Sequence, residues 1–116
     1  MADAPPIDNA MFIELQESAG ADFVAELIDT FLEDAPQRLA ELQRFGAAGE
    51  AVAFRRAAHS LKSNGNTFGA TALAAQAREL ELADLAAQSE RLPPLLAALA
   101  AEYERAAAAL RRLRDA

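Results

Sequence analysis

Apolar positions recur at helical spacing along most of this chain. They follow steps of three or four residues between about 21 and 45 and again between about 50 and 68. Such a stripe buries one face of an amphipathic helix. No stretch alternates with period two over a useful length, so the pattern predicts an all-α protein. The first stripe comprises Phe23, Leu27, Phe31, Ala35, Leu39 and Leu42, and the second Phe54, Ala58, Leu61, Gly65 and Phe68.

The N-terminal segment predicts a flexible tail followed by a short helix. Residues 1–6 contain two prolines and no periodic pattern. Asp8 is suited to cap a helix that ends near Gly20, and Ile7 and Phe12 stand at the two positions of a hydrophobic staple.

Proline and glycine predict the other boundaries. Pro36 predicts a kink or a split in the helix over 21–45, because proline removes a backbone donor and crowds the preceding turn. A turn at 46–49 closes that helix, and the third helix ends at Gly69. A fourth helix is expected from Ala70 to about Leu85, and a loop over 86–92 leads to the last helix.

The last helix is expected to open at Pro93-Pro94 and to run to the end of the chain. Its stripe comprises Leu95, Leu99, Tyr103, Ala106, Leu110 and Leu113. Short connections favour antiparallel neighbours. We therefore expect residues 7–116 to form one domain, an antiparallel four-helix bundle with a short additional N-terminal helix.

The composition excludes several classes of function. The 116 residues include no cysteine, one histidine, and 18 Asp and Glu against 11 Lys and Arg, for a net charge of −7. Thiolate chemistry and zinc motifs with paired histidines are excluded. An acidic chain argues against nucleic-acid binding. With neither a signal peptide nor a membrane-spanning stretch in the sequence, we expect a cytoplasmic protein whose partner is another protein or a small group.

His59 is the only side chain whose unperturbed pKa lies near neutrality, so acid–base or nucleophilic chemistry begins there. It shares a stripe with Arg55, Lys62 and Asn66, displaced by roughly 100° from the core stripe, and is therefore expected to be exposed. The neighbouring cations would repel a metal ion, so no metal site is expected.

The same cations favour an anion such as a phosphoryl group. Arg55, Arg56, Lys62 and Arg78 are four of the 11 basic residues of an otherwise acidic chain. An imidazole attacks phosphorus through one ring nitrogen when the proton of the other nitrogen is held, best by a carboxylate. Small residues around His59 would let a partner protein approach closely.

The segment 58–70, AHSLKSNGNTFGA, resembles the histidine-containing phosphotransfer (HPt) family of two-component phosphorelays through its H-x-L-K…G-A pattern. The resemblance extends over nearly the whole chain and agrees with the four-helix bundle. The segment Thr67-Phe68-Gly69 also looks like the phosphoacceptor domain of chemotaxis histidine kinases.

This resemblance implies a role for each matching residue. His59 would be the phosphorylated residue, Lys62 a cation that steadies the phosphoryl oxygens, and Gly69 the small residue near the site. Glu81 falls where the family places a polar residue that hydrogen-bonds the imidazole. Alternatively, Glu81 forms only a surface pair with Arg78 three residues earlier on the same helix.

Ser63 departs from the family pattern, which often has glycine at this position, and a small serine should preserve access to His59. A docking surface for the partner would draw on residues around His59. The candidates are Arg55, Arg56, Ser63, Asn66 and Arg78.

The resemblance also implies the partners. The chain has no nucleotide-binding loop, so it should not phosphorylate itself from ATP. The phosphoryl group would come from the aspartate of a response-regulator receiver domain, including that of a hybrid sensor histidine kinase. Mg²⁺ would be bound by the receiver, and no cofactor is expected here. A monomer is expected, although apolar heptads ending at Leu113 could extend into a dimer.

Three other functions remain open from the sequence. The chain could be a docking module that binds a receiver or kinase without being phosphorylated, and an exposed histidine argues against this. It could be the phosphoacceptor domain of a larger kinase. A hydrolase is disfavoured because no nucleophile stands at a recognisable elbow to complete a triad with the histidine.

Overall fold

The computed structural model describes residues 5–116, which form six helices and no strand. In chain order they are α1 (Asn9–Ala19), α2 (Ala21–Ala48), α3 (Ala51–Phe68), α4 (Thr71–Glu81), α5 (Leu85–Gln88) and α6 (Leu92–Asp115). Of the predicted tail, residues 1–4 lie outside the described residues, while Pro5 and Pro6 precede α1 without joining a helix.

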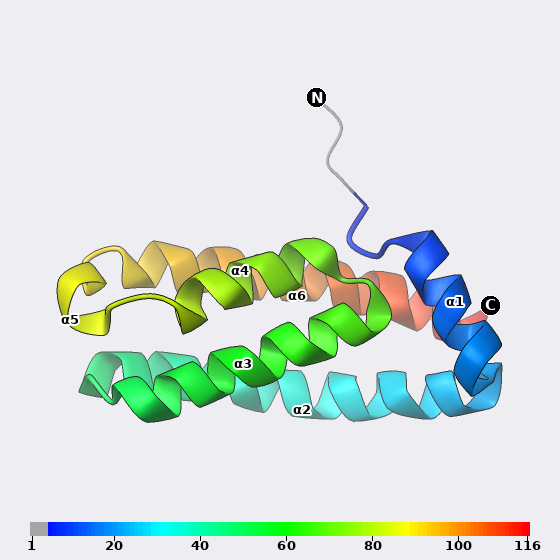
Figure 1. The fold of residues 1–116 in the computed structure, drawn as a ribbon, viewed down its shortest axis with the longest axis horizontal. Helices are drawn as coiled ribbons and strands as arrows, with labels where there is room; N and C mark the ends of the chain where they lie inside the picture. Colours follow the sequence, from blue (N-terminus) through cyan, green and yellow to red (C-terminus); the bar gives the residue numbers. More distant parts are fainter. Residues whose placement is uncertain (1–4) are drawn as a thin grey trace.

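Four helices form the bundle. Contacts join α2 to α3, α3 to α4, α4 to α6 and α6 back to α2, so the four helices close a ring around one core. Neighbours in this ring run antiparallel, and α1 lies across one end of the bundle (Figure 1). The predicted all-α architecture, an antiparallel four-helix bundle with a short N-terminal helix, is confirmed.

The chain enters α1 as the sequence predicts. The Oδ1 atom of Asp8 accepts a hydrogen bond from the backbone N–H of Met11 at 3.1 Å, which satisfies one of the free donors of the first turn. Ile7 and Phe12, the two residues of the expected staple, are both buried in the core. Gly20, with φ of +92°, ends α1 and begins α2 within one residue.

The α2 helix is continuous, and it differs from the prediction at its end and at Phe23. It is not split at Pro36, and it continues to Ala48, where Gly49 adopts the left-handed conformation and ends it. Phe23, expected in the buried stripe, is 52% exposed, and Val24 is buried in its place. Val24 lies on the face of α2 that meets α1 and the end of α6, whereas Phe23 is rotated by about 100° from it.

The connection between α4 and α6 also differs from the prediction. The α4 helix ends at Glu81 and not near Leu85, and the expected loop over 86–92 contains the one-turn helix α5. Asp84 explains both differences, because its Oδ1 atom accepts hydrogen bonds from the backbone N–H groups of Ala86 and Ala87 and so starts a new helix. Leu85 is buried and anchors this turn.

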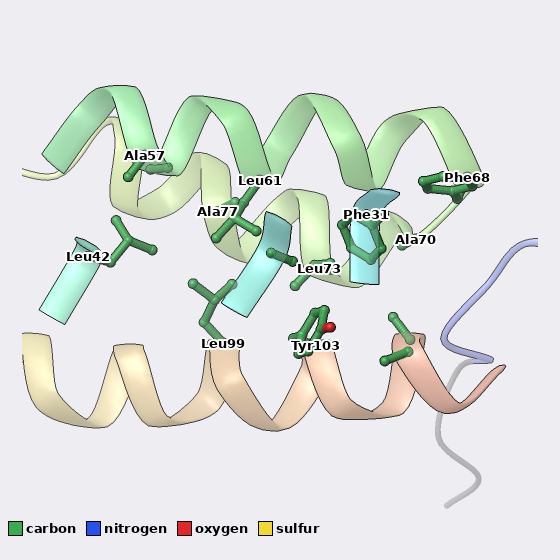
Figure 2. Close-up of a cluster of buried hydrophobic side chains, with 14 of the residues drawn as sticks. Phe31, Leu42, Ala57, Leu61, Phe68, Ala70, Leu73, Ala77, Leu99 and Tyr103 are labelled. Carbon is green, nitrogen blue, oxygen red and sulfur yellow. The ribbon is translucent and has the colours of Figure 1, made fainter. Parts of the chain in front are cut away.

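The core is a continuous layer of leucine, alanine and aromatic side chains (Figure 2). Phe31 of α2 lies between Phe68 of α3 and Tyr103 of α6, with ring centroids 5.4 and 5.7 Å apart. All five residues of the stripe predicted on α3 are buried. The stripe of the last helix also faces the core, with Leu95 and Leu113 partly buried at its ends. The core therefore fixes the orientation of α3 about its own axis, and this orientation determines which residues of α3 face solvent.

Candidate functional site

His59 lies near the middle of α3, outside the face of the helix that meets the core. Its side chain is 59% exposed, as the periodicity predicts. Ala58 and Leu61, two core residues close to it in sequence, are fully buried and hold this part of the helix in place. The result is a helix anchored on the core that presents an accessible imidazole.

Glu81 is the residue that contacts the ring. The Nδ1 atom of His59 lies 2.6 Å from Oε2 of Glu81, and the Nζ atom of Lys62 donates a hydrogen bond to Oε1 at 2.7 Å. Each carboxylate oxygen therefore has its own partner. No pair between Glu81 and Arg78 occurs among the described residues, which disfavours the alternative of a simple surface pair on α4.

Two donors keep Glu81 ionised. The hydrogen bond from Lys62, followed by that from His59, lowers the pKa of the Glu81 carboxyl below its ordinary value of 4.5. Glu81 is the last residue of α4, where the helix dipole disfavours a negative charge, so these donors also offset an unfavourable position.

This charge state fixes the proton on the imidazole. An ionised carboxylate can only accept hydrogen bonds, so Nδ1 of His59 is the nitrogen that carries the proton. In the neutral ring the lone pair is then on Nε2. Since Nδ1 is engaged with Glu81 and the side chain is largely exposed, Nε2 is the nitrogen available for attack.

Lys62 reaches the site indirectly. The resemblance implies contact with the phosphoryl oxygens, but the structure places Nζ on the carboxylate of Glu81, with the side chain only 24% exposed. Lys62 follows His59 by three residues and lies on the α4 side of α3, so the shared carboxylate links all three side chains.

Gly69 lies away from His59. Ten residues of helix separate the two, about 15 Å along the axis. Gly69 has a φ of +79° and ends α3, and its carbonyl oxygen accepts a hydrogen bond from the N–H of Asp8 at 2.8 Å. A β-carbon here would lie 3.0 Å from Cβ of Met11. Its small size thus serves the contact between the end of α3 and the start of α1.

Gly65 is a residue whose contribution the sequence analysis missed. A β-carbon at this position would lie 3.3 Å from the carbonyl oxygen of Ala70 and from the backbone nitrogen of Ala74. The missing side chain therefore lets α4 approach α3 closely. Glu81 stands on this same α4, so Gly65 helps to set the distance over which the carboxylate reaches His59.

The residues expected to form a docking surface fall on two sides of His59. Asn66 and Arg78 line a small hollow on the α4 side, together with Lys62. Arg55 and Arg56 line a larger hollow that includes His59 itself and opens toward α2. Ser63 is exposed but lines neither of these two hollows.

Arg38 and Glu41 of α2 also line the larger hollow, and the sequence analysis did not single them out. The guanidinium of Arg38 contacts the carboxylates of Glu41 at 2.6 Å and of Asp34 at 3.6 Å. Their i,i+3 and i,i+4 spacing is visible in the sequence, but their place beside His59 depends on the packing of α2 against α3.

Two other kinds of feature were sought in the described part of the chain. Within residues 5–116, no group of three or more His, Cys, Asp or Glu side chains is arranged to hold a metal ion. None of the helices in this range is both long enough and apolar enough to cross a membrane.

Comparison with known proteins identifies the class. The sequence model of the Hpt domain family matches residues 26–109, a range that includes α3 with His59 and α4 with Glu81. The chain belongs to this family. Among curated proteins, none matches the sequence.

A solved structure agrees with this assignment. The fold is similar to that of histidine-containing phosphotransfer protein B (HptB) from Pseudomonas aeruginosa PAO1, with a TM-score of 0.82 and 30% sequence identity. The similarity covers 97% of each chain, so it includes the short N-terminal helix as well as the bundle.

Proposed function

We propose that this protein is a phosphorelay intermediate, which accepts a phosphoryl group on Nε2 of His59 and passes it to a second protein. The observation that carries the proposal is the exposed imidazole whose Nδ1 proton is held by the ionised carboxylate of Glu81, in a chain of the Hpt family. An oriented nucleophile with an open approach is what such a transfer requires.

The transfer is a substitution at phosphorus. The lone pair on Nε2 attacks the phosphorus of an aspartyl phosphate, the bond between phosphorus and the aspartate oxygen breaks, and its electron pair stays on the aspartate as a carboxylate. The imidazole gains positive charge as the new bond forms. Glu81 offsets this charge through its bond to Nδ1–H, which remains in place throughout. The reverse step returns the phosphoryl group to an aspartate.

The partners follow from this chemistry. Proteins of the Hpt family work with receiver domains and kinases. For this chain we propose a response-regulator receiver domain, including one attached to a hybrid sensor histidine kinase, as donor and acceptor in the cytoplasm. The Mg²⁺ needed for transfer would be held by the receiver. We propose that this chain acts as a monomer, without a cofactor of its own, and does not use ATP.

The proposal is tested by phosphoryl transfer to the wild-type protein and to the His59→Gln variant. Each is incubated with receiver domains carrying radiolabelled phosphate and Mg²⁺. Label that is acid-labile, base-stable and confined to the wild type supports a phosphohistidine at His59. Circular dichroism of the variant controls for folding.

Two other outcomes would overturn the proposal. Receivers that bind the protein without labelling it would favour a docking module that is never phosphorylated. Label that persists in the His59→Gln variant would assign the phosphoryl group to another residue.

A further inference from the structure

A small hollow of about 250 Å³ lies between α3 and α4, which pack side by side (Figure 1). We call it the α3–α4 hollow. Its volume is several times that of a water molecule in the liquid, so it has room for a small solute. Four of its six lining residues carry side-chain hydrogen-bond donors, and none is acidic. The lining comprises Lys62 and Asn66 of α3 and Thr71, Ala74, Ala75 and Arg78 of α4.

Most of these side-chain donors are unused. The guanidinium of Arg78 makes neither an ion pair nor a hydrogen bond within residues 5–116. The side chains of Asn66 and Thr71 also make no hydrogen bond in this range. Lys62 uses one of its three N–H groups on Oε1 of Glu81 and has two left. Both helices therefore bring free donors to the same hollow.

The hollow carries positive charge although the protein as a whole is acidic. Carboxylates are abundant in a chain with a net charge of −7, yet none in the described range lies within ion-pair distance of Arg78. Glu81 balances the charge of Lys62. The charge of Arg78 is left without a partner, and it attracts an anion and repels a metal ion.

A tetrahedral oxyanion matches this set of donors. A guanidinium binds phosphate through two parallel hydrogen bonds, and such charge-assisted bonds are stronger than neutral ones. The oxygens of phosphate point in several directions, so one ion can accept from Arg78 on α4 and from Lys62 on α3 together. Asn66 and Thr71 add neutral donors. A planar carboxylate has only two oxygens and would satisfy fewer of these groups.

Lys62 connects the hollow to the histidine. Its Nζ atom donates to Oε1 of Glu81, and Oε2 of the same carboxylate contacts Nδ1 of His59. An oxyanion in the hollow attracts the ammonium and places negative charge near the carboxylate, so the bond between Lys62 and Glu81 weakens. By thermodynamic linkage, this bond in turn weakens binding of the oxyanion.

We propose that the α3–α4 hollow binds a small oxyanion of the phosphate type, and that the bound ion competes with Glu81 for Lys62. The proposal goes beyond the phosphorelay function, because it adds a second site whose occupancy changes the contacts of the carboxylate that holds His59. Binding at this site requires no phosphoryl transfer.

Titration of inorganic phosphate into ¹⁵N-labelled protein tests the site, with the ionic strength held constant by NaCl. We expect saturable shifts of the backbone amides of Asn66 and Thr71 and of the Nε signal of Arg78. The Arg78→Gln variant should bind phosphate about tenfold or more weakly, because charge-assisted hydrogen bonds are lost. Arg112→Gln, at an exposed position on α6 outside the hollow, is the matched control and should bind as the wild type does. Circular dichroism checks that both variants are folded.

Two readouts test the competition for Lys62. The ¹⁵N signal of its Nζ atom should shift in saturating phosphate, because the bond to Glu81 weakens. Glu81→Gln removes the competing carboxylate and should bind phosphate about fivefold or more tightly. Glu79→Gln removes the same charge from an exposed position on the same helix, and its affinity should stay within about twofold of the wild type.

The site would be overturned by shifts that do not saturate, by equal shifts with acetate, or by wild-type affinity in Arg78→Gln. The competition would be overturned by an unchanged Lys62 signal in saturated protein, or by a Glu81→Gln variant that binds no more tightly than Glu79→Gln. None of these readouts uses transfer to His59, so failure of this proposal and failure of the phosphorelay function are distinguishable.

Discussion

Replacing Glu81 with glutamine tests the role of its charge directly. Both atoms that contact the carboxylate are donors: Nδ1 of His59 at 2.6 Å and Nζ of Lys62 at 2.7 Å. A glutamine amide has one acceptor oxygen and one NH₂ group, so it can accept from only one of these partners in the same geometry. The other donor would face an NH₂ group.

The lysine ammonium can only donate, and it therefore takes the amide oxygen of Gln at position 81. The NH₂ group then faces Nδ1, which can pair with it only as an acceptor. In the neutral ring this moves the proton to Nε2, the nitrogen that must attack phosphorus. We expect the rate of phosphorylation of His59 to fall by about 10- to 100-fold, the range found when the carboxylate partner of a metal-ligating histidine is replaced.

Two measurements check this expectation. Phosphorylation by phosphoramidate gives the rate without a contribution from docking, and ¹⁵N NMR of the His59 ring reports which nitrogen carries the proton. Glu79→Gln, an exposed position on the same helix, is the matched control and should leave both unchanged. A Glu81→Gln variant that keeps the Nδ1–H form and reacts within about twofold of the wild-type rate would refute the argument.

Three further predictions concern charge and packing. Because the pKa of Glu81 is lowered, its ion pairs persist below pH 4.5 and are lost as the pH falls through the folded-state pKa. Titration of the Glu81 carboxyl by ¹³C NMR should show this pKa rising toward 4.5 in Lys62→Met, because the strongest donor is removed. Gly69→Val forces a branched side chain to a φ of +79° and against Met11, so the free energy of unfolding in urea should fall by about 2 kcal/mol or more. An unchanged unfolding midpoint would contradict the contact with α1. Leu61→Ala leaves a cavity under the middle of α3 and should cost about 3 kcal/mol in the same assay, and a loss below about 1 kcal/mol would mean that the core collapses to fill it.

The sequence predicted α3 well because its stripe is long and its last turn is closed by glycine. The prediction that Phe23 is buried was wrong, because packing against α1 and the end of α6 determines which residues at the start of α2 face the core. The sequence prediction also extended α4 by about one turn, because the apolar Leu85 continues the periodic pattern. The cap that Asp84 provides for a new helix is a local signal that competes with this pattern.

The candidate site was predictable to a different extent for each residue. The exposure of His59 followed from periodicity alone, and Glu81 was reached through the resemblance to the family. The bond between Lys62 and Glu81 could not be derived, because the partner of a long side chain depends on how closely α4 approaches α3. The same applies to Arg38, which meets the site only through the packing of α2.

The position of Glu81 on the last residue of α4 has a thermodynamic consequence. The final carbonyl groups of a helix lack intrahelical partners, and helix ends open with less free energy than the whole domain needs to unfold. Opening of the last turn would carry Glu81 away from His59 while α3 stays folded on its core. We therefore expect amide hydrogen exchange at the end of α4 to be faster than in the middle of α3, and phosphorylation of His59 to decline with temperature before the bundle melts.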